Sequence, residues 1–260
     1  MDTTTLLLLA DGRFPSGGHA HSSGLEAAVA AGRVTDVDGL AAFLSGRLAT
    51  AGRVAAAFAA AAHLAATPAG HPADADRTAD GERAADTDRS GAGDHVAPGP
   101  GVARARDALV RLDAELDART AAPAARLASR RQGRALLRAA RTTWPSPLLD
   151  LVPRHSDGCH QPIALGVTAA AAGLTVDRAA LIGAYGTVTG PAGAAVRLLG
   201  LDPYRTQAVL ARLAGACDAV AGAAVLDAAG PPAALPAHAA PLADIHAEVH
   251  ATWEVRLFAS

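Results

Sequence analysis

The sequence contains no lysine and no asparagine, and it has few aromatic residues and only two cysteines. Aromatic residues make up 3% of its 260 residues and hydrophobic residues 50%, so a core must be built mainly from alanine, leucine and valine. Alanine is the strongest helix former, and the residues that favour strands are scarce. No alternating apolar and polar run of strand length is present. The sequence therefore predicts an all-α fold.

These scarcities also exclude several classes of function. A phosphate-binding P-loop needs a lysine after its last glycine, so the glycine cluster at 12–24 is not a nucleotide site of that kind. The formal net charge of -2, with arginines interspersed among acidic residues, argues against nucleic-acid binding. Cys159 and Cys217 belong to no CxxC pair, which argues against a disulfide framework and fits a reducing cytosol.

The amino-terminal segment and the apolar stretch at 179–196 bear on localisation. The segment starts with an acidic residue, and its apolar run at 6–9 is too short for a secretory signal. The stretch at 179–196 has about the minimum length of a membrane span, but several glycines and Pro191 interrupt it. We interpret it as a buried helix pair, which predicts a cytoplasmic protein with no membrane segment.

One helical-bundle domain with a disordered insert is the predicted organisation. Its first part, residues 1–66, holds the amino-terminal segment and the first helices. Residues 67–102 are rich in Pro, Gly and Asp and contain almost no large apolar side chain, which predicts a flexible insert. The remaining helices lie in 103–260 and are predicted at 103–120, 124–141, 163–172, 176–184, 202–224 and 242–258.

Small residues recur at helical spacing in the stretch at 179–196. They would leave a groove without side chains, where another backbone can approach closely. The groove serves either helix packing inside the domain, which we favour, or contact with a second copy of the chain. The residues are Gly183, Gly186, Gly190 and Gly193.

Three places carry residues of the types that bind metals or catalyse reactions. His19 and His21 supply two imidazoles, fewer than a stable metal site needs. His246 and His250 share one face of a predicted helix, but the intervening acid is not placed as in a helical zinc motif. Cys159 and His160 are residues of the types that form a cysteine nucleophile and its general base, but the side chains of adjacent residues usually point in different directions. None of these patterns favours catalysis.

The amino-terminal run from Leu7 to Glu26, LLLADGRFPSGGHAHSSGLE, resembles the signature of the UreF family of urease accessory proteins. The resemblance continues at GRALL (133–137), Trp144-Pro145, HQPIALG (160–166), AAVRL (194–198) and RLFAS (256–260), in the family's order. Two departures stand out. His19 occupies a position where many members carry an aromatic residue, and the stretch at 67–102 is longer than the usual link between early helices.

The resemblance implies an all-helical adaptor that performs no bond chemistry and needs no cofactor of its own. Such a protein acts as a chaperone of urease maturation: it dimerises, binds the UreD (UreH) scaffold and recruits the GTPase UreG. GTP hydrolysis is thereby coupled to nickel insertion into apo-urease, so that nickel is handled by the complex.

Two segments are predicted to bind these partners. In the first, glycines would let a loop lie close against a partner, and Glu26 could accept charge-assisted hydrogen bonds. In the second, a terminal helix could dock as an apolar anchor with a charged end. An ordinary glycine turn with a solvated glutamate and a frayed terminus are the alternative interpretations. The predicted residues are Gly17, Gly18, His19, His21, Gly24, Glu26, Arg256, Leu257, Phe258 and Ser260.

Two other functions stay open at this stage. A nickel carrier would hold the metal through His19, His21, His246 and His250, which requires the two ends of the chain to meet. An enzyme based on Cys159 and His160 would need a depressed thiol pKa.

Overall fold

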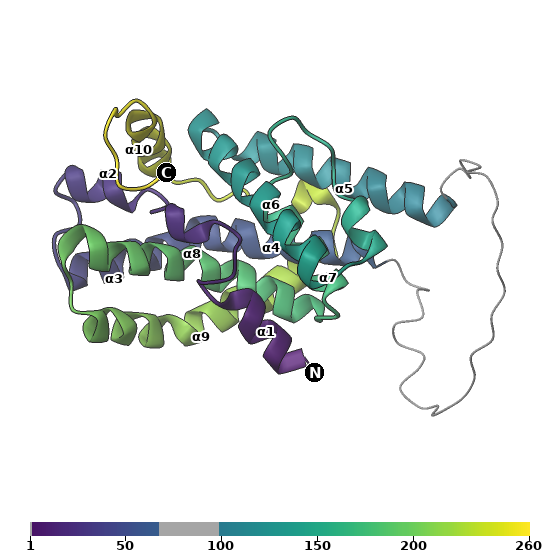
Figure 1. Ribbon diagram of the computed structural model, residues 1–260, viewed down its shortest axis with the longest axis horizontal. Helices are drawn as coiled ribbons and strands as arrows, with labels where there is room; N and C mark the ends of the chain where they lie inside the picture. The colour runs from purple at the N-terminus through teal and green to yellow at the C-terminus, as the bar shows by residue number, and fades with distance from the viewer. Residues whose placement is uncertain (1, 68–98) are drawn as a thin grey trace.

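A computed structural model describes residues 2–67 and 99–260 of the chain. The regular secondary structure of these residues is helical, and they contain no strand (Figure 1). This confirms the predicted all-α fold. The elements in chain order are α1 (Asp2–Ala10), η1 (Gly18–Ala20), α2 (Leu25–Ala30), α3 (Val37–Arg47), η2 (Leu48–Gly52), α4 (Arg53–Ala66), α5 (Pro100–Arg119), α6 (Pro123–Thr143), η4 (Pro147–Asp150), α7 (Gln161–Ala171), α8 (Val176–Leu199), α9 (Pro203–Ala228), η5 (Pro232–Ala234) and α10 (Pro241–Ala251).

The predicted insert at 67–102 lies mostly outside the described residues, in the range 68–98. Its last three residues are helical, because α5 already begins at Pro100. Proline suits a first helical position, where its missing N–H would have no partner in any case.

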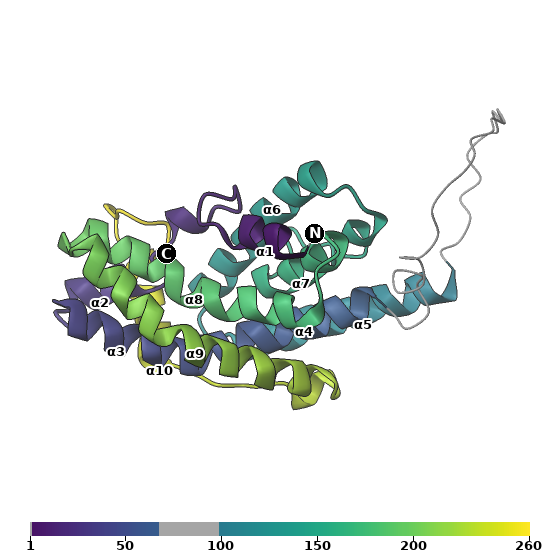
Figure 2. The ribbon, with the colours of Figure 1, turned by 90° about the horizontal axis from the view of Figure 1, so that it is seen from below.

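Helix α4 is the centre of the bundle and packs against α5, α7, α8 and α9 (Figures 1 and 2). Its alanines from Ala56 to Ala62 are buried, so neighbouring backbones come close. A Cβ added at Gly166 of α7 would lie 2.2 Å from the carbonyl oxygen of Ala59. One added at Gly183 of α8 would lie 3.1 Å from Cα of Ala56. Small residues thus allow a tight core despite the scarcity of aromatic side chains.

Helix α8 runs without a break from Val176 to Leu199, although a pair of helices was predicted here. Pro191 cannot donate a hydrogen bond to the carbonyl of Thr187, four residues earlier, and this loss normally interrupts a helix. Nε of Arg47 donates to that same carbonyl oxygen at 3.2 Å. The prediction of a helix pair was wrong because a side chain from α3 replaces the missing backbone donor.

The predicted helix at 242–258 is also shorter than expected, because α10 ends at Ala251. Residues 252–260 leave the helix and turn back toward the loop between α1 and α2 (Figure 1). Their backbone groups bond to that loop and to α2.

Three helical stretches in the described residues are long and apolar enough to cross a membrane: Val37–Ala66, Val176–Leu199 and Pro203–Ala228. In the first two, 56% of the apolar window is buried inside the bundle, as was predicted for the stretch at 179–196. In α9 only 28% is buried, so this helix presents an apolar face that the described chain does not cover.

Candidate partner-binding site

The loop between α1 and α2 owes its shape to residues with positive φ. Gly17 has φ 80° and Gly24 has φ 88°, which glycine adopts without strain. Ser23 has φ 56° despite its side chain. Backbone in this conformation turns successive N–H groups toward one side, where they can share one acceptor.

The acceptor is the carbonyl oxygen of Ser260, at the other end of the sequence. The backbone N–H groups of Ser22 and Ser23 donate to it at 2.6 and 3.1 Å, and the hydroxyl of Ser22 donates at 2.9 Å. In the opposite direction, the N–H of Ala259 donates to the carbonyl of Ala20 at 2.7 Å. The two segments predicted to bind partners therefore bind each other.

Glu26 fixes the C-terminal segment from the side of α2. Its carboxylate accepts hydrogen bonds from the backbone N–H groups of Leu257 (2.7 Å) and Phe258 (3.0 Å) and from Nε2 of His250 (2.8 Å). Burial raises the pKa of the Glu26 carboxyl, but these three bonds outweigh burial and hold the pKa below its ordinary value. Glu26 is only 8% exposed. Both oxygens of the carboxylate thus accept bonds from groups of the same chain.

Arg197 of α8 contacts both the loop between α1 and α2 and the C-terminal segment. Its guanidinium donates to the carbonyl of His19 at 2.8 Å and lies 4.3 Å from the centre of the Phe258 ring. Such a cation over an aromatic face is attractive. Phe258 is 2% exposed. It therefore serves as an anchor inside the chain.

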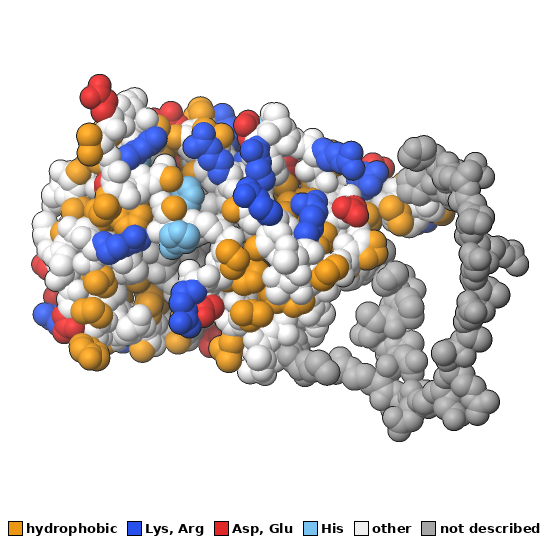
Figure 3. Space-filling view, viewed as in Figure 1, with side chains coloured by type: hydrophobic (Ala, Val, Ile, Leu, Met, Phe, Trp, Pro, Cys, Tyr) orange, Lys and Arg blue, Asp and Glu red, His pale blue; other side chains and the backbone are white. Residues whose placement is uncertain are grey.

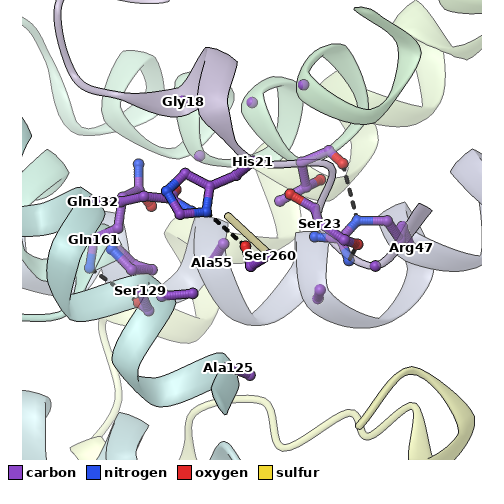
Figure 4. A pocket seen from close by; sticks show the side chains of 18 of the residues that line it. Gly18, His21, Ser23, Arg47, Ala55, Ala125, Ser129, Gln132, Gln161 and Ser260 are labelled. Atoms are coloured by element: carbon purple, nitrogen blue, oxygen red, sulfur yellow. Dashed lines mark hydrogen bonds between the residues drawn. The ribbon is translucent and has the colours of Figure 1, made fainter. Parts of the chain in front are cut away.

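Arg47 supports the loop from α3. Besides its bond to the carbonyl of Thr187, it donates to the carbonyl of Ser23 at 2.7 Å, as Figure 4 shows. Burial lowers the pKa of its guanidinium to about 10, so it remains charged at neutral pH. One cation thus ties α3, α8 and the loop together.

A cavity of about 740 Å³ lies beside this junction, lined by the loop, the C-terminal segment, and parts of α4, α6, α8 and α10. Histidine and arginine side chains gather around the middle of this face in Figure 3. His21 is 8% exposed and borders the cavity, and its Nδ1 lies 2.6 Å from the hydroxyl of Ser260 (Figure 4). Gly186, Gly190 and Gly193 line the cavity with open space beside them, whereas Gly183 packs on α4.

Comparisons with known proteins show the family of the chain. The profile of the UreF family matches residues 34–214. The urease accessory protein UreF of Mycobacterium sp. (strain JLS) is 42% identical over 257 residues, which cover 99% of this chain and 98% of the relative. The UreF of Mycolicibacterium vanbaalenii is 40% identical, with 98% of each chain covered, and that of Mycobacterium tuberculosis (strain ATCC 25177 / H37Ra) is 39% identical, with 83% and 82% covered.

The chain belongs to the UreF family. The match with the relatives includes both segments of the junction, because it spans nearly the whole chain. The profile match starts after the amino-terminal signature, so the signature and the C-terminal segment are tied to the family by these relatives.

The residues predicted to bind partners in this UreF-family chain fall into three groups. Three are exposed and available to a partner: His19, Arg256 and Leu257. Three are buried and hold the junction together: His21, Glu26 and Phe258. The remaining four are partly exposed, and these are Gly17, Gly18, Gly24 and Ser260.

The histidines of the proposed nickel carrier are not gathered into a metal site. Nε2 of His250 bonds to Glu26, and Nδ1 of His21 faces the hydroxyl of Ser260. Within residues 2–67 and 99–260, no group of three or more His, Cys, Asp or Glu residues could hold a metal ion. The two ends of the chain meet, but the junction does not supply a ligand set.

A second polar cluster lies between α5, α6 and the start of α7, and the sequence did not predict it. Arg130 donates to Asp113 at 2.9 Å and to Asp117 at 2.7 Å. The His160 ring bridges Asp117 and the hydroxyl of Ser129, each at 3.0 Å. The sequence does give a signal for Asp113. It lies on the apolar helix face formed by Leu109, Leu112 and Leu116, where a charged side chain needs a partner.

This cluster joins a serine, a histidine and an aspartate, but its bonds suit a structural role. Asp117 is neutralised by Arg130, and the hydroxyl of Ser129 already accepts a bond from the N–H of Gln161 at 3.2 Å. Burial lowers the pKa of His160, partly offset by Asp113 and Asp117. These bonds hold α5, α6 and the start of α7 together.

The thiol of Cys159 is predicted to be unreactive in the folded protein. Burial, followed by the negative charge of Asp113, raises its pKa well above the ordinary value, the reverse of what a nucleophile needs. We expect iodoacetamide at pH 7.5 to alkylate it much more slowly than a free thiol, because the thiolate is disfavoured and the side chain is buried. Mass spectrometry of the labelled peptides measures the rate, and urea-unfolded protein is the control. Rapid labelling in the native state would instead support an enzyme based on Cys159 and His160.

Proposed function

We propose that this chain is an adaptor of urease maturation that bridges the UreD (UreH) scaffold and the GTPase UreG, so that nickel is inserted into apo-urease. The name of its relatives, urease accessory protein UreF, supports the general role in urease maturation. The bridging of these partners, action as a chaperone, and a cytoplasmic location are our proposals.

One observation carries the adaptor proposal: the junction presents exposed side chains on a backbone that is fixed from several sides. Leu257 is 60% exposed, while its own N–H is held by Glu26 and its neighbour Phe258 is buried. Arg256 and His19 are exposed on the two segments that the junction joins. A fixed backbone with protruding apolar and charged side chains suits recognition, because little conformational entropy is lost on binding.

We propose a homodimer as the assembly state, with the outer face of α9 as the contact. This face combines exposed small residues, such as Ala211, Gly215 and Ala219, with the exposed large side chains of Tyr204 and Leu226. Small residues let a second helix approach closely, and the large ones add apolar area.

The test uses size-exclusion chromatography with light scattering on the protein alone and mixed with its UreD and UreG counterparts, with GTP and nickel. We expect the protein alone to have the mass of a dimer and the mixture to co-elute. Leu257→Asp should weaken the complex by about 30-fold or more, since losing a central anchor commonly costs about 2 kcal/mol. Circular dichroism should be unchanged.

Val110→Asp is the matched control, because Val110 is an exposed apolar residue on α5, away from the junction. It should leave the complex intact. Equal weakening by both variants, or no association under any condition, would contradict the adaptor role. Stoichiometric nickel binding by the protein alone would instead support the carrier alternative.

A further inference from the structure

One corner of the cavity brings together polar side chains from three elements, and we call it the His21 corner. Figure 4 shows the His21 ring beside the side chains of Gln132 and Gln161. Arg131 lines the same cavity from the neighbouring position on α6. The corner is formed by His21, Arg131, Gln132 and Gln161.

The ring of His21 is oriented so that its second nitrogen is available to a ligand. The Ser260 hydroxyl is bonded to Nδ1, and His21 as a residue is 8% exposed. Nε2 has no bond to any residue in the described part of the chain, nor do the side-chain amides of Gln132 and Gln161. In the tautomer in which the Ser260 hydroxyl donates to Nδ1, Nε2 carries the proton of the neutral ring and is a donor.

The charge of the cavity favours an anion. Its basic lining residues are Arg47, Arg119, Arg131, Arg197 and Arg256, and its acidic ones are Asp11 and Asp244. Burial lowers the pKa of His21, and the positive charges of Arg131 and His19 lower it further. A neutral N–H donor, two amides and a guanidinium match the acceptors of a carboxylate or phosphate.

The rest of the cavity indicates what carries the anionic group. A volume of about 740 Å³ lies in the range of ligand pockets and exceeds the space that a single small ion fills. Apolar side chains such as Leu136, Leu165 and Ile182 form part of its wall. We propose that the His21 corner binds the oxyanion group of an organic anion, whose apolar body occupies the adjoining cavity. The source is either a free carboxylate or phosphate compound or an acidic side chain of a bound polypeptide. This proposal does not depend on the adaptor role.

The test is a titration of the full-length protein at constant ionic strength, followed by the ¹⁵N resonances of histidine side chains. The probes are benzoate, inorganic phosphate and a capped Leu-Glu-Leu tripeptide. We expect a saturable shift of the His21 Nε2 resonance. Arg131→Gln should weaken binding about tenfold, as expected for loss of a charge-assisted bond. Arg138→Gln, the same charge change on the same helix but outside the cavity lining, should leave it within about twofold.

Each outcome decides the proposal. Tighter binding of benzoate or phosphate supports it with a free anion as the source, and tighter binding of the tripeptide supports it with a polypeptide. No saturable shift with any probe up to about 50 mM, a concentration that would detect even binding weaker than millimolar, overturns it. Equal weakening by both arginine variants overturns it as well, since that result reports general charge attraction. A His21 shift produced by nickel chloride but by none of the anions assigns the corner to a cation instead.

Discussion

Replacing Glu26 with alanine should release residues 252–260 and lower the free energy of unfolding by about 3 kcal/mol, because three donors, two of them in buried bonds, lose their acceptor. The donors are His250 Nε2 and the N–H groups of Leu257 and Phe258. Urea denaturation measures the loss, and hydrogen exchange of the amides at 257 and 258 measures the release. Protection at these amides should fall together with stability.

Glu254→Ala is the matched control, because Glu254 is exposed and lies in the same segment. It should change the free energy of unfolding by less than about 0.5 kcal/mol. A Glu26→Ala variant that keeps the protection of residues 257 and 258 would contradict the assigned role of the carboxylate.

The same bonds imply a dependence on pH. The folded protein holds the pKa of Glu26 below its ordinary value of 4.5. A group with a depressed folded pKa contributes stability that is present above its unfolded pKa and is lost as pH falls through the folded pKa. Protection of the C-terminal segment should therefore be constant at neutral pH and fade only below about 4.5, and this loss should be absent in Glu26→Ala.

Gly166→Ala should destabilise the protein by about 3 kcal/mol or prevent folding, because overpacking a tight core forces backbone to move. The added Cβ would lie 2.2 Å from the carbonyl oxygen of Ala59 and 2.8 Å from the Cβ of Ala62. Neither of these atoms lies at the end of a flexible side chain that could move away. Thermal and urea unfolding of the purified variant measure the effect, with soluble expression as the first readout.

Gly46→Ala in α3 makes the same chemical change where nothing lies within 4 Å of the new methyl group. It should stabilise the protein by about 0.5 to 1 kcal/mol, since alanine is the better helix former. A Gly166→Ala protein as stable as the wild type would show that α4 and α7 do not pack as closely as described.

The fold class could be predicted because it depends on local composition. Alanine-rich, aromatic-poor segments with apolar residues three and four apart have few alternatives to helices. The errors arose where a distant residue decides a local outcome. Pro191 is a helix breaker by local rules, but Arg47, well over a hundred residues earlier, supplies the missing donor. The position of the segment after α10 likewise involves Glu26, which accepts bonds from Leu257 and Phe258.

The candidate site was predicted only as two separate segments. Sequence patterns can indicate that Gly17 and Gly24 form a turn, but no period relates them to Ser260. Nor could the sequence separate the buried Glu26 from the exposed Leu257, because burial at the junction comes from contacts between the two ends of the chain. The cluster of Asp113 and Arg130 was missed for a related reason: its members lie on different helices.

The meeting of the two segments has a consequence for biosynthesis. Glu26 and Phe258 are 232 residues apart, so a ribosome needs roughly 10 to 50 s to make the second after the first. During that time α2 and the loop before it exist without the backbone donors that they hold in the finished fold. A chain that stops before residue 257 lacks the two backbone N–H groups that donate to Glu26. Until residues 257 and 258 have been made, the Glu26 carboxylate lacks the two backbone partners that it has in the folded protein.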